Sequence, residues 1–495
     1  MNDNILILDE FGTTIKGVKN KSIRSISIPN SVTSIGHKAF EDCTNLTSIT
    51  IPDGVTSIGE YAFGGCSNLT SIHIPDCVKK IGKGAFCGCT KLKSITIPNN
   101  VTSIEDWAFS DCSGLTSIHI PDGVTSIGEM AFEGCSELTS IDIPDGVTSI
   151  GWGAFAGCSN LTSITIPNNV TSIEDWAFSG CSNLTSIHIP DCLTSIGEYA
   201  FRDCSGLTSI HIPDGVTRRI EEGTFYDCKS LNSIHIPNSV KSIGHNAFKG
   251  CTSLTSITIP DNVTSIERYS FYGCTSLTSI IFPDFLESIE RYSFYGCSKL
   301  TSIDIPFNIE YIGEHAFDVC PIENLTLPRQ TKYNINSFDK MTKIENLKVF
   351  ISYSWDDEDH KAWVEKLATD LNKYVHVILD KWDLRAGNDM AHFMEQSVSQ
   401  SNKVLCILTP NYKQKCDSRK GGSGYESSLI SAEIVRVNPP SKFIPILRSG
   451  DLVNSCPLSL SPKLGLDFSS NDPEIYKKML QKLLSEIKEE NLRPE

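Results

Sequence analysis

The sequence LTSITIPDGVTSIGEYAFGGC fills residues 46–66, and close copies of it follow one another over the first two thirds of the chain. Ile49 and Ile51 alternate with polar residues, which is typical of a short strand with one buried face. Pro52 and Gly54 then predict a turn. The other apolar residues of this copy are Val55, Ile58, Ala62, Phe63 and Cys66. One copy is too short to bury these side chains alone, so the copies must stack and share a core.

Cysteine marks the period of the repeat. Thirteen of the 19 cysteines recur at intervals of 23 residues, with a single interval of 24. They are Cys43, Cys66, Cys89, Cys112, Cys135, Cys158, Cys181, Cys204, Cys228, Cys251, Cys274, Cys297 and Cys320. This spacing predicts one small buried cysteine per turn, and in a reducing cytosol we expect thiols and not disulfides. The one extra residue, near Thr217–Ile220, predicts a local bulge.

The pattern LxxIxIP…VxxIxxxAFxxC, repeated thirteen times, resembles the BspA-like leucine-rich repeats. The resemblance covers residues 21–330 and implies a solenoid of 13 turns, each of about 23 residues with short parallel strands. Residues 1–20 lack the pattern and are expected to cap the first turn. Residues 331–345 are polar and short, and we expect them to be a linker.

One row of side chains is predicted to face outward, at the position between the two isoleucines of each strand. Five of the eleven histidines occupy it, namely His73, His119, His188, His211 and His235. The last three fall on successive turns, about 5 Å apart. The row is either a binding surface for an unidentified protein or other ligand, or a solvated face whose polar residues were copied with the repeat. We expect no metal site there.

Net charge and hydropathy limit the partners and the cellular compartment expected for the chain. The formal net charge is −16, which argues against nucleic acid or an anionic membrane as a partner. The first residues, MNDNILILDE, do not read as a signal peptide, and no apolar run reaches the ~18 residues of a membrane span. We therefore expect a soluble, cytoplasmic protein.

After residue 346 the period stops, and strands alternate with helices. Strands are predicted at 348–353, 375–379, 404–408, 443–447 and 466–468. Helices are predicted at 360–371, 390–398, 425–436 and 475–488. This alternation predicts a parallel sheet covered on both faces, with any ligand at the carboxyl ends of the strands.

Five short motifs occur in order in this part of the chain. They are VFISYSWDD (349–357), ILDKWDLRAGND (378–389), VLCILTPNY (404–412), AEIV (432–435) and FIPIL (443–447). Together they resemble a bacterial-type Toll/interleukin-1 receptor (TIR) domain, or the closely related SEFIR domain, over residues 346–490. The resemblance implies an α/β, flavodoxin-like fold.

Many TIR domains are NAD+ nucleosidases, and the resemblance implies this activity here, with NAD+ as substrate and no cofactor. The family's catalytic glutamate matches Glu433, and Glu426, seven residues earlier, is the second choice. Cleaving the nicotinamide–ribose bond builds positive charge on the ribose, which a carboxylate stabilises. The residues expected to bind the substrate are Tyr353, Ser354, Trp355, Trp382, Leu384, Gly387 and Tyr425. Leu429 departs from the tryptophan that several animal relatives have four residues before the glutamate.

Three functions remain open from the sequence. In the first, the repeats recognise a ligand or partner and the TIR domain cleaves NAD+ when it self-associates. In the second, the TIR or SEFIR domain is a non-enzymatic adaptor, and Asp380, Asp383 and Arg385 are surface contacts for homotypic packing. In the third, which the missing signal peptide disfavours, the protein is a surface adhesin.

Overall fold

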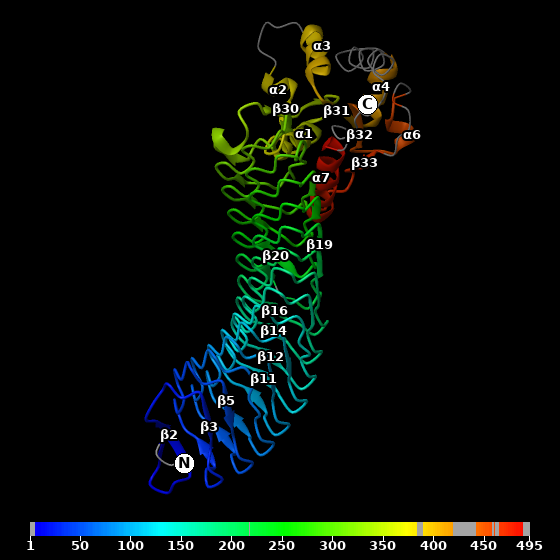
Figure 1. Ribbon diagram of the computed structural model, residues 1–495. Coiled ribbons are helices and arrows are strands. Elements are labelled where there is room, and N and C mark those ends of the chain that lie inside the picture. The colour runs from blue at the N-terminus through cyan, green and yellow to red at the C-terminus, as the bar shows by residue number, and fades with distance from the viewer. Residues whose placement is uncertain are drawn as a thin grey trace. The chain divides into compact units, whose positions relative to one another are not determined.

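The computed structural model describes residues 5–216, 218–383, 390–418, 442–457, 460 and 465–488. The chain divides into two compact units (Figure 1). The first comprises residues 1–306, 310–323 and 332–342, and the second comprises residues 307–309, 324–331 and 343–495.

Each turn of the first unit contributes up to two short strands, which pair in parallel with the same strands of neighbouring turns. The strands that carry the outward row are β3 (Ser25–Ser27), β5 (Ser48–Thr50), β8 (Ser94–Thr96), β10 (Ser117–His119), β13 (Ser163–Thr165), β15 (Ser186–His188), β17 (Ser209–His211), β19 (Ser233–His235), β21 (Ser256–Thr258) and β23 (Ser279–Ile281). The second set consists of β4 (Ser34–Ile35), β6 (Ser57–Ile58), β7 (Lys80–Ile81), β9 (Ser103–Ile104), β11 (Ser126–Ile127), β12 (Ser149–Ile150), β14 (Ser172–Ile173), β16 (Ser195–Ile196), β18 (Arg218–Ile220), β20 (Val240–Ile243), β22 (Ser265–Ile266), β24 (Ser288–Ile289), β25 (Tyr311–Ile312) and β27 (Lys332–Tyr333). Equivalent residues pair directly, as Ile127 does with Ile104 and Ile150, so the sequence repeat becomes a set of ladders.

The most regular ladder is made of phenylalanine. One buried ring per turn stacks on the next from Phe40 to Phe338, with interplanar angles of 12° or less. Ring centroids lie between 5.0 Å (Phe271–Phe294) and 5.7 Å (Phe201–Phe225) apart. The ladder therefore runs through the core of the whole repeat.

The repeat cysteines are buried free thiols, which confirms the predicted role. From Cys66 onward each thiol also donates a hydrogen bond to a phenylalanine carbonyl of the preceding turn, as in Cys66 Sγ to Phe40 O (3.2 Å) and Cys112 Sγ to Phe86 O (3.1 Å). Burial raises the pKa of Cys66 to about 12. A thiol fits here because it fills little volume and still satisfies a buried backbone acceptor.

A second position of each turn, two residues before the phenylalanine, has left-handed backbone. Gly84 (φ 60°), Gly153 (57°) and Gly223 (57°) occupy it in three turns, whereas Tyr269 (58°) and Tyr292 (60°) occupy it in others. The left-handed region costs an L-residue with a side chain roughly 1–2 kcal/mol. An aromatic stack contributes about 0.5–1.5 kcal/mol. Stacking thus offsets the backbone cost of a tyrosine without making it clearly better than glycine for folding.

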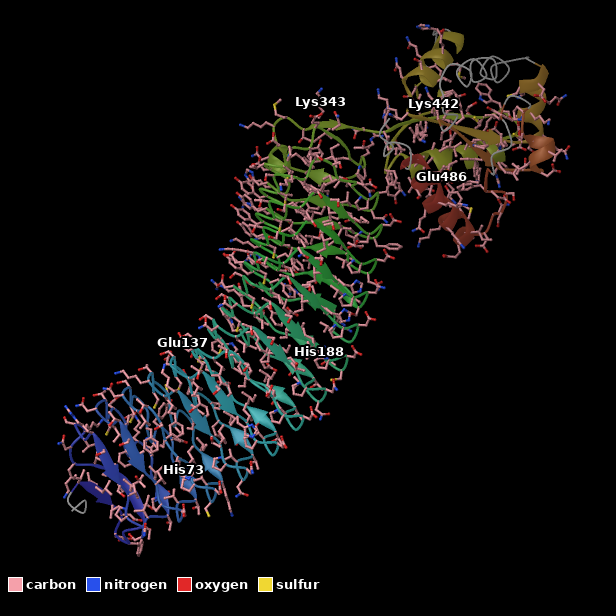
Figure 2. The ribbon with its side chains drawn as sticks, turned by 45° about the vertical axis from the view of Figure 1, so that its right-hand side comes forward. His73, Glu137, His188, Lys343, Lys442 and Glu486 are labelled. Carbon is pink, nitrogen blue, oxygen red and sulfur yellow. The ribbon has the colours of Figure 1, made fainter. Side chains whose placement is uncertain are left out.

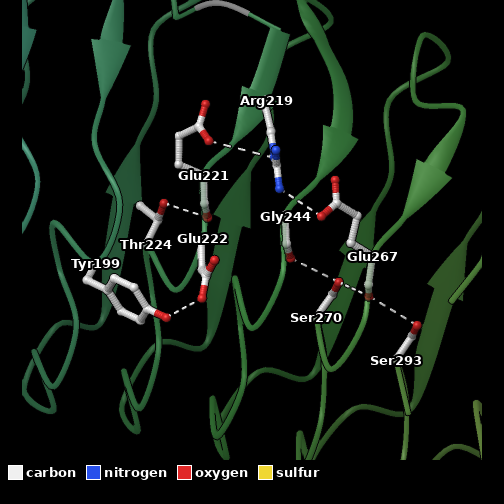
Figure 3. Close-up of polar contacts among 9 residues, drawn as sticks. All are labelled: Tyr199, Arg219, Glu221, Glu222, Thr224, Gly244, Glu267, Ser270 and Ser293. Atoms are coloured by element: carbon white, nitrogen blue, oxygen red, sulfur yellow. Dashed lines mark hydrogen bonds and ion pairs between the residues drawn. The ribbon is translucent and has the colours of Figure 1, made fainter. Parts of the chain in front are cut away.

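The extra residue of the repeat produces the predicted bulge. The register between β18 and β20 shifts between Arg218 and Arg219. The Arg219 guanidinium then lies 3.7 Å from the Glu221 carboxylate and 2.7 Å from that of Glu267 (Figure 3). Because Gly244 supplies no side chain on the intervening turn, Arg219 reaches Glu267 two turns away.

The ends of the repeat differ from its middle. At the start, β1 (Leu6–Leu8) and β2 (Thr14–Val18) form an antiparallel hairpin, and β2 pairs with β4. The prediction of a linker at 331–345 is wrong, since β27 pairs with β25 and Phe338 stacks on Phe317. The 3-10 helix η1 (Ile335–Ser337) lies between them. The phenylalanine position persists in this turn although the cysteine that marks the period is missing.

The second unit contains the pair β26 (Asn324–Thr326) and β28 (Lys343–Glu345) and a five-stranded parallel sheet. The sheet order is β30-β29-β31-β32-β33, the flavodoxin-like order. Its strands are β29 (Lys348–Ser352), β30 (His376–Ile378), β31 (Lys403–Leu408), β32 (Phe443–Leu447) and β33 (Leu466–Asp467). All five predicted strands are confirmed.

Helices cover both faces of this sheet, as predicted. One core joins the sheet to α1 (Glu358–Leu371) and α7 (Pro473–Lys488), and the other joins it to α3 (Met390–Gln400) and α4 (Pro410–Ser418). The sequence did not predict α4 or the short helices α2 (Asp380–Asp383) and α6 (Leu452–Ser455). The helix predicted at 425–436 lies outside the described residues.

Candidate functional site

Polar and aromatic residues follow three neighbouring strands at the carboxyl edge of the sheet. Tyr353, Ser354 and Trp355 come directly after β29, Asp380 comes two residues after β30, and Thr409 follows β31. These strands are adjacent and parallel, so the residues meet at one edge. Strands β30 and β31 lie on opposite sides of β29, so the strand order reverses between β29 and β31. Ligands of such sheets bind at this point, outside the carboxyl ends of the strands.

The centre of this edge is a buried carboxylate, Asp380. Its Oδ1 accepts a hydrogen bond from the Tyr353 hydroxyl (3.0 Å), and its Oδ2 accepts one from the Trp355 indole Nε1 (3.0 Å). Burial, and then the charge of Asp380, raises the pKa of Tyr353, so its hydroxyl stays a donor. The hypothesis that Asp380 is a surface contact is therefore wrong, because only 6% of it is exposed. The carboxylate instead fixes an indole that is itself 58% exposed.

A second polar network supports the loop after β29 from within. The buried Ser354 hydroxyl donates to the Asp356 carboxylate and lies 3.2 Å from the Thr409 hydroxyl. The Asn411 side chain also donates to Asp356, over 2.5 Å. Ser354 has no exposed surface for a ligand, so its place in the structure favours positioning the loop.

His360, which the sequence did not single out, is buried on α1 below the same edge. Its ring centroid lies 6.1 Å from that of Tyr353, and its Nε2 has no hydrogen-bond partner among the described residues. Burial lowers the pKa of His360, so the imidazole is neutral at neutral pH.

The structure thus brings part of the predicted site together. Tyr353 and Trp355 share Asp380, and Trp382, 42% exposed, lies two residues beyond it on α2. The other predicted or weighed residues lie outside the described residues, namely Glu433, Glu426, Tyr425, Leu384, Gly387, Arg385 and Leu429. The catalytic carboxylate therefore stays a prediction. Asp383 is exposed and accepts a hydrogen bond from the Leu379 amide (2.9 Å).

The histidine row of the repeat is exposed, as its pattern predicts. His73, His119, His188, His211 and His235 all point to solvent, and Figure 2 labels the first and third. The His211 and His235 rings stack with centroids 6.3 Å apart. In the part of the chain that the structure describes, no three His, Cys, Asp or Glu side chains converge as metal ligands would. Binding of a partner on this row stays a prediction.

Replacing Asp380 by alanine should destabilise the second unit by about 1–3 kcal/mol, because the buried Tyr353 hydroxyl loses its acceptor. Hydrogen exchange read by mass spectrometry over residues 349–379 measures this unit separately from the repeat. Asp359→Ala, an exposed carboxylate on α1, is the matched control and should change exchange little. Unchanged protection in Asp380→Ala would contradict the role given to the carboxylate.

Comparison with known proteins assigns the repeat and the C-terminal domain to two different families. Residues 17–139, 125–219 and 218–345 match the family described as "BspA type Leucine rich repeat region (6 copies)", and residues 349–484 match the family described as "TIR domain". No curated protein matches. In the described residues, no helix has the length and apolar composition of a membrane span.

Three solved structures illustrate the similarity. A leucine-rich repeat protein from Bacteroides ovatus is 32% identical with a TM-score of 0.52, covering 69% of this chain and 98% of its own. A leucine-rich cell surface protein from Faecalibacterium prausnitzii is 30% identical with a TM-score of 0.41, covering 61% and 92%. A prokaryotic SEFIR domain is 37% identical with a TM-score of 0.25, covering 28% of this chain and 98% of its own.

Proposed function

The chain belongs to the BspA-type leucine-rich repeat proteins and continues into a TIR domain, and from this premise we propose that it is a sensor–effector. In this proposal the repeats bind a partner, copies of the chain assemble, and the TIR domain cleaves NAD+ with release of nicotinamide. The two domain types support a signalling or protein-interaction role, and the cleavage is the finer part of the proposal.

The observation that best supports NAD+ cleavage is the indole of Trp355, which is exposed and held in place at the carboxyl edge of the sheet. The buried Asp380 holds it by the Nε1 hydrogen bond of 3.0 Å. A flat aromatic surface held in one orientation is suited to stack on a nucleotide ring, and such stacking contributes about 1–3 kcal/mol. This edge is also the usual ligand site of the fold.

In the proposed reaction the ribose–nicotinamide C–N bond breaks and its electron pair leaves with neutral nicotinamide. The ribose carries positive charge until water adds to it and gives up a proton, leaving ADP-ribose. A carboxylate beside the ribose stabilises that charge, and Glu433 is the residue proposed to supply it. Tyr353 and Ser354 take part by holding the loop that carries Trp355.

The test uses the full-length chain with an N-terminal tag, incubated with NAD+ before and after clustering with a bivalent antibody against the tag. Nicotinamide, measured by chromatography, should rise on clustering. Trp355→Ala should lower the rate at least about fivefold, because the lower end of a stacking contribution is about 1 kcal/mol. Trp152→Ala, which removes a partly exposed indole of the repeat unit, should not.

The alternative is a non-enzymatic adaptor, and the exposure of both Trp355 (58%) and Trp382 (42%) favours it, because tryptophan is enriched at interaction hot spots. Folded, clustered protein that leaves NAD+ intact would support this alternative and refute the cleavage. In that case Trp355→Ala and Trp382→Ala should weaken self-association, measured by analytical ultracentrifugation.

A further inference from the structure

A group of aromatic and basic side chains lies on the repeat, away from the histidine row and after the second strand of each turn. We call it the aromatic ridge. It consists of Tyr226, Lys249, Tyr269, Tyr272, Tyr292 and Tyr295, all of which are partly exposed. The repeat pattern does not fix these positions. The position after the phenylalanine is glycine, alanine or serine in four other turns, and the left-handed position is glycine in three turns and tyrosine or tryptophan in six.

The rings of the ridge form two joined columns. Tyr269 stacks on Tyr292 with centroids 5.1 Å apart, and Tyr272 stacks on Tyr295 at 5.0 Å. Contacts of 5.8 Å (Tyr269–Tyr272) and 5.6 Å (Tyr292–Tyr295) connect the columns. The tyrosines are therefore ordered before any partner arrives, so a partner would lose little entropy in fixing them.

Two of these tyrosines, Tyr269 and Tyr292, occupy the left-handed position, which is glycine in three turns and a residue with a side chain in the others. Serines follow them directly and brace the backbone. Ser270 Oγ donates to Gly244 O (3.1 Å), and Ser293 Oγ donates to Glu267 O (3.2 Å; Figure 3). These hydrogen bonds hold the backbone that carries Tyr269 and Tyr292 and so help to order the two rings.

Lys249 is the charge at the centre of the ridge. Its Nζ lies 5.2 Å, 5.6 Å and 5.3 Å from the ring centroids of Tyr226, Tyr269 and Tyr272. No carboxylate among the described residues forms an ion pair with it. Arg202 and Arg291, which lie over the Tyr226 and Tyr292 rings, each have one, in Arg202–Asp203 (3.0 Å) and Arg291–Glu314 (3.0 Å). Lys249 therefore offers a held, unneutralised positive charge among phenol rings.

We propose that the aromatic ridge is a docking surface for a protein segment that places an acidic side chain on Lys249 and aromatic or apolar side chains on the tyrosines. Tyrosine is enriched at interaction hot spots. One lysine at the centre of the ridge, on a chain of net charge −16, does not suit a partner held mainly by its negative charges, such as nucleic acid or a sulfated polysaccharide. The proposal rests on the partner-binding part of the proposed function and is independent of NAD+ cleavage.

The test measures binding of a fluorescent random copolymer of glutamate and tyrosine to the full-length chain, by fluorescence anisotropy. The wild-type protein should bind this copolymer more tightly than polyglutamate or heparin. Lys249→Gln should weaken binding at least about tenfold, the effect of one charge-assisted contact. The Tyr272→Ala, Tyr295→Ala double variant should weaken it similarly.

Lys241→Gln is the matched control, because it removes an exposed lysine 8 residues before Lys249, and it should leave binding unchanged. Circular dichroism establishes that each variant is folded. Absent binding by the wild type, equal binding by Lys249→Gln, or tighter binding of heparin would each overturn the proposal. Nicotinamide release, measured on the same samples, separates this outcome from failure of the proposed cleavage.

Discussion

Nicotinamide release should fall at least about 100-fold when Glu433 is replaced by alanine, if the TIR domain cleaves NAD+ as proposed. Removing one group that stabilises charge in the transition state typically lowers kcat by about 10²–10³-fold. Here it would stabilise the positive charge that develops on the ribose as the C–N bond breaks. Glu433→Gln keeps the size of the side chain and removes the charge, so it should be nearly as inactive. Full-length, clustered protein and chromatographic detection of nicotinamide make the measurement.

Glu426→Ala tests which of the two candidate glutamates is catalytic, because Glu426 lies seven residues earlier in the same predicted helix. Loss of release in Glu426→Ala alone would move the catalytic role to that residue. Release that survives in the double variant would place the chemistry on another group. Binding of NAD+ should remain measurable in Glu433→Gln, since Trp355 and its support by Asp380 are unchanged.

The structure of the repeat could be predicted almost residue by residue, because the same pattern occurs thirteen times in the sequence. A buried isoleucine, phenylalanine or cysteine in one turn must contact its copy in the next, and the register of the strands then follows. The failure came at 331–345, where the cysteine is missing. Stacking continues there through Phe338, which packs on Phe317, so the ring and not the thiol defines the turn.

The candidate site was less predictable, because its contacts join distant parts of the chain. Trp355 and Asp380 were both noticed, but their spacing of 25 residues does not show that one holds the other. An aspartate in an exposed-looking loop reads as solvated, and only the fold buries it. The aromatic ridge was not predicted from the sequence, for a different reason. Its tyrosines look like ordinary variation in the sequence, because their stacking between turns and their contacts with Lys249 exist only in the fold.

Phe178→Ala should destabilise the repeat by about 3–5 kcal/mol, the usual cost of removing a buried phenylalanine. The Phe178 ring is fully buried and stacks on both sides, at 5.5 Å from Phe155 and 5.6 Å from Phe201. In a solenoid each turn is stabilised mainly by its neighbours, so a weak turn in the middle uncouples the two halves. Urea unfolding followed by circular dichroism should therefore become broader or split into two transitions.

Phe40→Ala is the matched control, because Phe40 is equally buried but its ring stacks on one neighbour, Phe63, at 5.3 Å. Its removal should cost less and should fray the first turn while the remaining turns unfold together. Hydrogen exchange would show the difference as lost protection confined to the first turns in Phe40→Ala and spread to both sides of the substitution in Phe178→Ala. Equal losses with sharp single transitions in both variants would mean that burial alone, and not stacking between turns, sets the stability of the ladder.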